Sequence, residues 1–145
     1  MVAMPEQEMG RFSVELELAN KVDINDARRG QLAPEKVRKI RVRGVVDSGA
    51  TRLVIPESVA KLLGLQFSGS TEVRYADGRK ADRQVVDDIY LTFGDRHGTF
   101  TAIVESARES VLIGAIVMEE LDLLIDCVTG RLLPRDPLKI ISEVE

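Results

Sequence analysis

The stretch Val45-Val46-Asp47-Ser48-Gly49-Ala50-Thr51 places an aspartate at the end of an apolar run, directly before a Ser-Gly pair. Burial at such a position disfavours an ionised carboxylate unless hydrogen-bond donors surround it. Gly49 permits a tight turn that brings backbone N–H groups toward the carboxylate, and the Ser48 hydroxyl can bond locally or across a contact. This is one way of holding a reactive carboxylate. An isolated Asp-Ser-Gly is more simply interpreted as a turn that only changes the chain direction.

The residues on either side of this turn predict two strands and a helix. Upstream, residues 39–46 first alternate basic and apolar side chains and then become continuously apolar, which is typical of a strand. Downstream, residues 53–55 form a short apolar run that predicts a second strand. Pro56 suits the first turn of a helix over 57–63, and Gly64 suits the left-handed residue just past its end.

The rest of the chain predicts mostly strands. Alternation with a period of two in residues 12–18 indicates a strand with one buried face. Further strands are expected over 73–75, 84–93, 100–104, 111–113, 123–125 and 132–133, with a second short helix near 116–121. Residues 22–36 have the composition of a loop, which we expect to be mobile. The fold class is therefore mainly β with one or two short helices, in a single domain over residues 1–145.

Composition excludes several classes of protein. The chain has 145 residues, of which 44% are hydrophobic and 30% charged, so one folded, soluble domain is expected. The formal net charge of −4 disfavours nucleic acid and acidic membranes as partners, and no stretch reaches the roughly 20 apolar residues of a membrane span. One cysteine excludes an internal disulfide, and residues 1–10 do not resemble a signal peptide. We expect a cytoplasmic protein.

The reactive side chains are few. With a single histidine, His97, a zinc site of several His and Cys ligands is hard to build, and a Ser-His-Asp triad would depend on that residue alone. Residues 94–98 around it predict a hairpin turn. No glycine-rich phosphate-binding motif is present. Carboxylates are left as the reactive groups, and we expect no metal and no cofactor.

A cationic segment leaves a second reading open. Residues 28–43 hold seven basic residues and one acid, Glu35. This excess could belong to a nucleic-acid-associated β-domain, but no aromatic residue interleaves it to stack on bases. A solvated strand face explains the same pattern.

Two halves of the chain share a faint likeness. Residues 45–63 and 111–121 each offer an apolar strand, a turn containing Gly and Ala, and a short helix. Together with the Ala76-Asp77-Gly78 turn, these motifs follow one another in an order that resembles the retropepsin-like family of single-domain aspartic proteases, especially its cellular, non-viral members. The resemblance covers roughly residues 40–133.

The resemblance implies roles for residues of the turn. Asp47 matches the catalytic aspartate, Ser48 the hydroxyl residue that braces the two active-site loops, and Gly49 the glycine whose N–H approaches the carboxylate. Ala50 falls where the family lines the substrate cleft.

It also implies roles for two other segments. Residues 72–86, with Ala76, Asp77 and Gly78 at the turn, match the flap hairpin that closes over a bound peptide; Asp-Gly is by itself a strong hairpin signal. Ile113 and Gly114 match the structural segment that crosses behind the active-site loop.

The family's subunit is a closed β-barrel or sandwich that works as a homodimer. The number of Asp-Ser-Gly motifs in this chain agrees with a homodimer. One Asp-Ser-Gly motif per chain cannot furnish two adjacent carboxylates, but a two-fold axis can bring Asp47 against its twin. The resemblance then implies an aspartic endopeptidase that hydrolyses extended polypeptides, with one Asp47 as general base and the other as general acid. The alternative is a catalytically silent peptide-binding or assembly module with the same fold.

Some positions depart from the viral pattern. Retroviral members usually carry an acid and an arginine, which form an ion pair supporting the dimer, where this chain has Thr51 and Ala115. Asp126 ends another apolar run, but without a following Ser/Thr-Gly it is interpreted as a turn residue, and Cys127 as partly buried. The terminal run 138–144, with Leu138, Ile140 and Ser142 on one face and Ile141 on the other, is a candidate strand for pairing across the two-fold axis.

Overall fold

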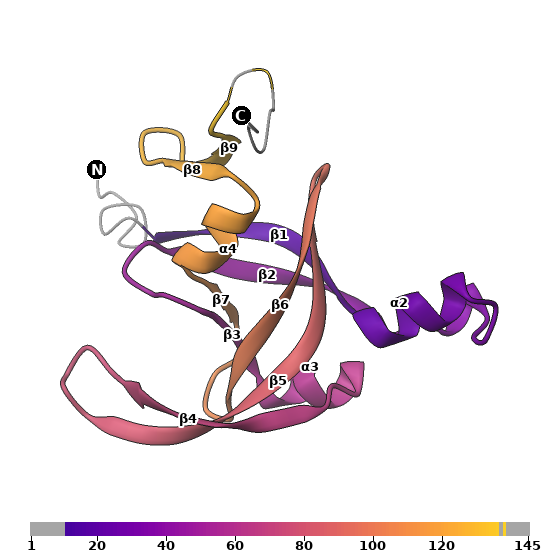
Figure 1. Ribbon diagram of the computed structural model, residues 1–145. Helices are drawn as coiled ribbons and strands as arrows, with labels where there is room; N and C mark the ends of the chain where they lie inside the picture. The colour runs from indigo at the N-terminus through magenta and orange to yellow at the C-terminus, as the bar shows by residue number, and fades with distance from the viewer. Residues whose placement is uncertain (1–10, 137, 139–145) are drawn as a thin grey trace, which may run out of the picture.

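Six strands close into a barrel, and a seventh extends the sheet (Figure 1). The computed structural model describes residues 11–136 and residue 138. The strand order is β1-β2-β7-β3-β6-β5-β4, and the ring closes because β1 also pairs with β5, between residues 17–20 and 89–92. The strands are β1 Arg11–Asn20, β2 Lys39–Asp47, β3 Leu53–Pro56, β4 Phe67–Arg74, β5 Lys80–Phe93, β6 Arg96–Glu105 and β7 Val111–Ile113, with a separate antiparallel pair formed by β8 Leu123–Asp126 and β9 Arg131–Pro134.

The helices are short and lie outside the barrel (Figure 1). They are α2 Lys21–Arg28, the 3₁₀ helix η1 Pro34–Lys36, α3 Glu57–Leu63 and α4 Ala115–Glu120. Pro56 directly precedes α3, and Gly64 ends it with φ +63°, as the sequence predicts. The mainly β fold and both expected short helices, α3 and α4, are confirmed.

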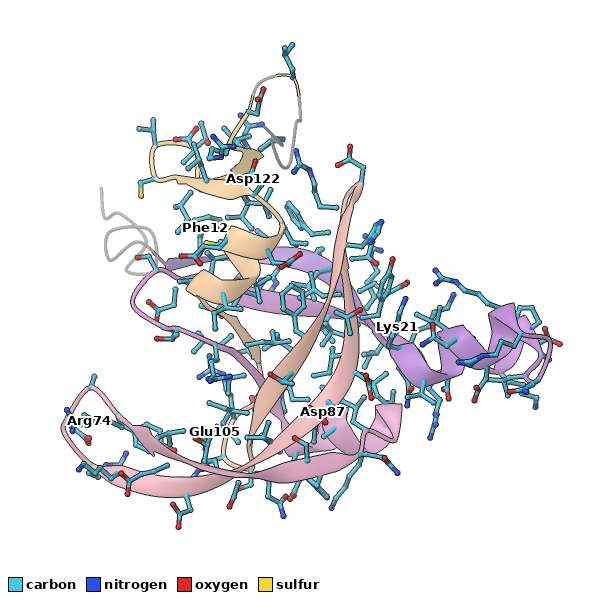
Figure 2. The ribbon with its side chains drawn as sticks, viewed as in Figure 1. Phe12, Lys21, Arg74, Asp87, Glu105 and Asp122 are labelled. Carbon is cyan, nitrogen blue, oxygen red and sulfur yellow. The ribbon has the colours of Figure 1, made fainter. Side chains whose placement is uncertain are left out.

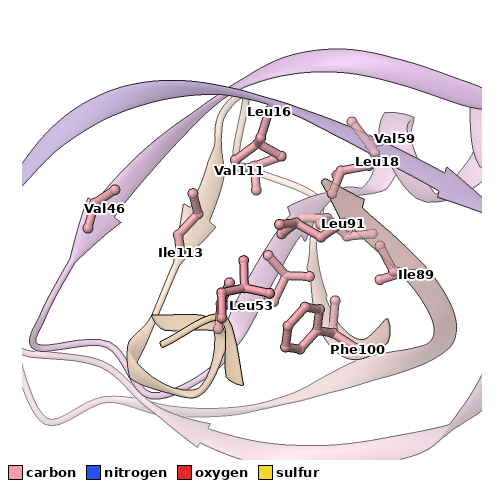
Figure 3. Packing of buried hydrophobic residues seen from close by; sticks show 14 of the residues in the cluster. Leu16, Leu18, Val46, Leu53, Val59, Ile89, Leu91, Phe100, Val111 and Ile113 are labelled. Carbon is pink, nitrogen blue, oxygen red and sulfur yellow. The ribbon is translucent and has the colours of Figure 1, made fainter. Parts of the chain in front are cut away.

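The barrel interior is filled by side chains that alternate along each strand (Figure 3). β1 contributes Leu16 and Leu18, and β5 contributes Ile89 and Leu91, all essentially without solvent exposure. Each such burial stabilises the fold by about 1.5–3 kcal/mol before entropy is counted. The core therefore draws on strands from both halves of the chain, including β7, whose Val111 and Ile113 lie beside Leu16 in the same cluster.

The parallel pairing of β2 with β7 positions the candidate site. Gly44 lies opposite Val111, and Val46 lies opposite Ile113. Parallel neighbours end at the same edge of a sheet, so the turn after Asp47 and the turn at Gly114 meet there. The two segments that resemble each other in sequence therefore lie side by side in the fold, with their turns at the same edge of the sheet.

The loop prediction for residues 22–36 is wrong over α2 and η1. The Asn20 side chain caps α2 by accepting a hydrogen bond from the Asp23 N–H at 3.0 Å, and its amide donates to the Leu63 carbonyl at 2.8 Å. Asp23, 6% exposed, accepts bonds from the Arg38 Nε at 2.8 Å and Nη2 at 3.0 Å. The polar residues that suggest a loop are the ones that cap and anchor this helix.

The cationic row of β2 is a solvated strand face with acids opposite it. Arg43 pairs in register with Glu15 of β1, and Arg41 pairs with Glu17. Opposite charges at paired positions attract one another across the ladder. The local excess of positive charge seen in the sequence is therefore reduced in the folded sheet.

Smaller expectations have mixed outcomes. The hairpin turn predicted around His97 is present at residues 94–95, but His97 itself lies just after it in β6, exposed, with its ring stacked on Tyr90 at a centroid distance of 5.4 Å. Of the terminal run, Leu138 is exposed and residues 139–145 lie outside the described part of the chain. In the described residues, no helix is long and apolar enough to cross a membrane.

Candidate active site

The turn after Asp47 holds the carboxylate with its own backbone. Asp47 is the last residue of β2 and is half-buried. Its Oδ1 accepts a hydrogen bond from the Gly49 N–H at 2.9 Å, as expected for the turn glycine, and its carbonyl accepts one from the Ala50 N–H at 3.1 Å. Ser48 between them is exposed. The carboxylate is thus oriented by a backbone donor while its turn stays open to a ligand.

Gly114 crosses behind this turn. The Ala115 N–H donates to the Ala50 carbonyl and the Ile116 N–H to the Thr51 carbonyl, both at 2.9 Å. A Cβ atom at Gly114 would lie 2.6 Å from the Arg52 carbonyl oxygen and 2.8 Å from that of Ala50. Only glycine allows so close an approach of two backbones. The segment containing Ile113 and Gly114 therefore has the structural place that the sequence predicts.

Residues 49–52 of the turn form one wall of a cleft of about 1090 Å³, whereas Asp47 and Ser48 lie next to it and do not line it. The other walls are the β4–β5 hairpin, the end of β6 and the loop over residues 106–110. The lining residues are Gly49, Ala50, Thr51, Arg52, Val54, Glu72, Val73, Arg74, Tyr75, Arg79, Arg83, Ile103, Glu105, Ala107, Arg108, Glu109, Ser110 and Leu112. Ala50 lines the cleft as expected, and the volume is large enough for several residues of an extended peptide.

The predicted hairpin over residues 72–86 is present and longer, because β4 begins at Phe67. Its tip is closed by the Gly78 N–H donating to the Tyr75 carbonyl at 2.9 Å, with Gly78 at φ +87°. The Asp77 carboxylate accepts bonds from Arg79, which lower the pKa of that carboxyl. Ala76, Asp77 and Gly78 are exposed at the tip and do not line the cleft in this structure.

The side chains of Tyr75, Arg83 and Glu105 form a network that was not predicted from the sequence. The Tyr75 hydroxyl and the Arg83 Nε both donate to the carboxylate of Glu105, the latter at 2.7 Å. The bond to Glu105 raises the pKa of the Tyr75 hydroxyl. Figure 2 marks Glu105 at the end of β6. No pattern along one strand signals this network, because Tyr75 follows β4, Arg83 lies in β5 and Glu105 ends β6.

The second candidate aspartate has a local role. The Asp126 carboxylate accepts bonds from the Val128 N–H at 3.0 Å and the Thr129 hydroxyl at 2.7 Å, and the Thr129 bond is the main cause that lowers its pKa. Its interpretation as a turn residue is confirmed. The expectation that Cys127 is partly buried is wrong, since Cys127 is exposed to solvent.

Across the described ranges, no three His, Cys, Asp or Glu residues gather where they could hold a metal ion.

Comparisons with known proteins agree with this geometry. A family model described as "Aspartyl protease" matches residues 21–125. Among solved structures, the EIAV protease complexed with the inhibitor HBY-793 is similar, with a TM-score of 0.53 and 13% sequence identity over 77% of this chain and 88% of that chain. At this identity the likeness shows the fold alone, and it confirms the fold predicted from the motifs. A comparison with curated protein sequences gave no match.

Proposed function

The chain belongs to the aspartyl protease family, and on this premise we propose that it is an aspartic endopeptidase acting on extended polypeptide segments. One observation carries the proposal: the Asp47 turn is held from behind by backbone bonds from Ala115 and Ile116 and forms the wall of a peptide-sized cleft. A turn that only reversed the chain would need neither feature.

The proposed reaction uses two carboxylates. Ionised Asp47 of one subunit removes a proton from water as the oxygen attacks the peptide carbonyl carbon, and protonated Asp47 of the partner subunit donates its proton to the carbonyl oxygen. When the tetrahedral intermediate collapses, the C–N bond breaks and the leaving nitrogen takes up the proton that the first Asp47 removed from water. One hydroxyl of the intermediate returns its proton to Asp47 of the partner subunit, so both carboxyl groups regain their starting states. The Gly49 N–H keeps the carboxylate oriented, and no cofactor takes part in the proposal.

The β4–β5 hairpin is the proposed flap. Its inner face already lines the cleft, and its exposed tip, residues 76–78, is available to fold over a bound chain. Closure would exclude water and add main-chain hydrogen bonds to an extended peptide. Ser48, exposed in the single chain, is the proposed brace between the two active-site loops.

A second copy of the chain is required because each chain has one such aspartate. The β8–β9 pair offers an apolar surface for it: Leu124 and Leu133 lie opposite each other and are 52% and 37% exposed. Thr51 and Ala115 stand where viral members carry the acid and the arginine that support their dimer. We therefore assign the chain to the non-viral, cytoplasmic members as part of the proposal.

The test is digestion of a peptide library by the wild type and by Asp47→Asn. Asparagine preserves size but cannot ionise, so we expect proteolysis to fall by several orders of magnitude while the fold is retained. Asp126→Asn is the matched control, because it alters the other aspartate at a strand end and should remain active. Full activity in Asp47→Asn would refute the assignment. Peptide binding without cleavage by the wild type would establish the silent module.

A further inference from the structure

The charge of the cleft is opposite to that of the chain. The chain carries a formal net charge of −4, yet five arginines and three glutamates line the cleft. The charged lining residues are Arg52, Arg74, Arg79, Arg83, Arg108, Glu72, Glu105 and Glu109. A concave surface with an excess of one sign concentrates ligands of the other sign.

The glutamates are poorly placed to reject an anion. Glu105, with its side chain 15% exposed, pairs with Arg83, and Arg79 pairs with Asp77 of the hairpin tip, so neither pair adds net charge. Against the exposed Glu72 and Glu109 stand three further arginines, Arg52, Arg74 and Arg108, which leaves an excess of positive charge in the cleft.

Two of the lining arginines, Arg52 and Arg108, belong to the loops that form the walls of the cleft. Arg52 follows Asp47 by five residues on the same loop and is exposed. Arg108 is held in the 106–110 loop by its Nε donating to the Ser110 carbonyl at 2.7 Å and its Nη2 to the Ser110 hydroxyl at 3.3 Å. A guanidinium presents several donors in a fixed plane and suits a carboxylate ligand.

The wall between these charges is apolar. It is formed by Ala50, Val54, Ile103 and Leu112, which are half-buried or buried and face the cleft. Apolar side chains next to the scissile bond would displace water from this surface.

We propose that the substrates are extended peptides in which an apolar pair at the scissile bond is flanked by acidic side chains that bind Arg52 and Arg108. The inference rests on the proposed function and specifies which peptides the proposed protease would cut. Because a two-fold dimer repeats the same half-cleft, the acidic preference applies on both sides of the scissile bond.

The test compares peptides with one apolar core, flanked on either or both sides by Glu, Gln or Lys. At pH 6 we expect kcat/KM to be about three- to tenfold higher for Glu than for Gln, the range for charge-assisted bonds in a water-accessible cleft. The ratio should approach one at pH 3.5, because a substrate glutamate with an ordinary pKa near 4.3 is then protonated. Arg52→Gln should lower the ratio, and Arg52→Glu should shift preference toward Lys.

Arg28→Gln, an exposed change on α2 away from the cleft, is the control and should leave the ratio unchanged. Binding of the same peptides to Asp47→Asn is measured in parallel, so that the charge preference is read without cleavage. Equal kcat/KM and equal binding for Glu and Gln peptides would overturn the inference even if both are cut. Acid-selective binding without cleavage by the wild type would instead retain the inference and remove the proteolytic function.

Discussion

At the scale of single residues, Gly114 determines how the reactive turn is supported. Its missing side chain lets β7 run on directly beneath Ala50, Thr51 and Arg52, so that two backbone donors reach two loop carbonyls. Buried backbone groups left without partners would be costly. The position of Asp47 therefore depends on a residue that carries no functional group.

Gly114→Ala should reduce kcat/KM by more than is explained by the fraction of protein that the substitution unfolds. The added methyl group must push the Asp47 turn away from α4, at a cost of about 1–3 kcal/mol in the free energy of unfolding. Thermal unfolding and kcat/KM on one peptide measure the two effects. Gly30→Ala is the control: it is strained by φ +75° but contacts nothing within 4 Å, so it should lose stability and keep activity. Equal activity in both variants at equal stability would show that the turn does not need this support.

The sequence alone places Asp47 and Gly49 in a short turn whose chemistry is local, whereas the role of Gly114 is inferred from the resemblance to the retropepsin-like family. It does not reveal Glu105 as the partner of Tyr75 and Arg83, since Tyr75 follows β4, Arg83 lies in β5 and Glu105 ends β6, and the three meet only after the barrel closes. Registers between strands are set by the whole core, and no residue in isolation encodes them.

At the scale of elements, the strands could be predicted and α2 could not. Alternation along β1 is visible in the sequence because one face of the strand lies in the core. Helix α2 shows no such pattern: its one buried residue is the charged Asp23. Asn20 followed three residues later by Asp23 is a capping signal. The helix is anchored, however, by the bond from Arg38, which lies beyond η1 in the chain, to the Asp23 carboxylate.

Asp23→Asn should destabilise the protein at neutral pH and make less difference in acid. The Arg38 guanidinium lowers the pKa of the Asp23 carboxyl below its ordinary value of 3.8. The pair's contribution is therefore fully present above about pH 4 and is lost as pH falls through the lowered pKa. At pH 7 we expect a loss of about 1–3 kcal/mol.

Thermal unfolding of the wild type and variant between pH 7 and pH 2 measures this contribution. The difference between the two should shrink toward the acid end. Asp26→Asn, on the same helix, leaves the Asp23–Arg38 pair intact and should follow the wild type throughout. A difference that persists unchanged at pH 2 would mean that packing, and not the ion pair, anchors α2.

At the scale of the whole molecule, one chain provides half of the proposed chemistry. Activity should therefore follow the fraction of chains in wild-type dimers. After unfolding and refolding wild type with a roughly ninefold excess of Asp47→Asn, random pairing leaves about one wild-type chain in ten with a wild-type partner, and activity per wild-type chain should fall about tenfold.

A second test of the dimer is Leu124→Asp, which places a charge on the exposed apolar pair of β8 and β9. It should shift sedimentation toward the monomer and reduce activity while the barrel stays folded. Activity proportional to the wild-type chains alone, in samples shown to contain mixed dimers, would rule out a shared site.

The parallel pairing of β2 with β7 also orders events during synthesis. Asp47 leaves the ribosome long before Ala115 and Ile116, whose N–H groups hold its turn. About 65 residues separate the two segments, which is several seconds of synthesis at about 5–20 residues per second. Throughout that interval the nascent chain carries the aspartate without the strand that builds its site. A growing chain that has not yet reached these residues therefore cannot carry out the proposed proteolysis, on itself or on its neighbours on the same messenger.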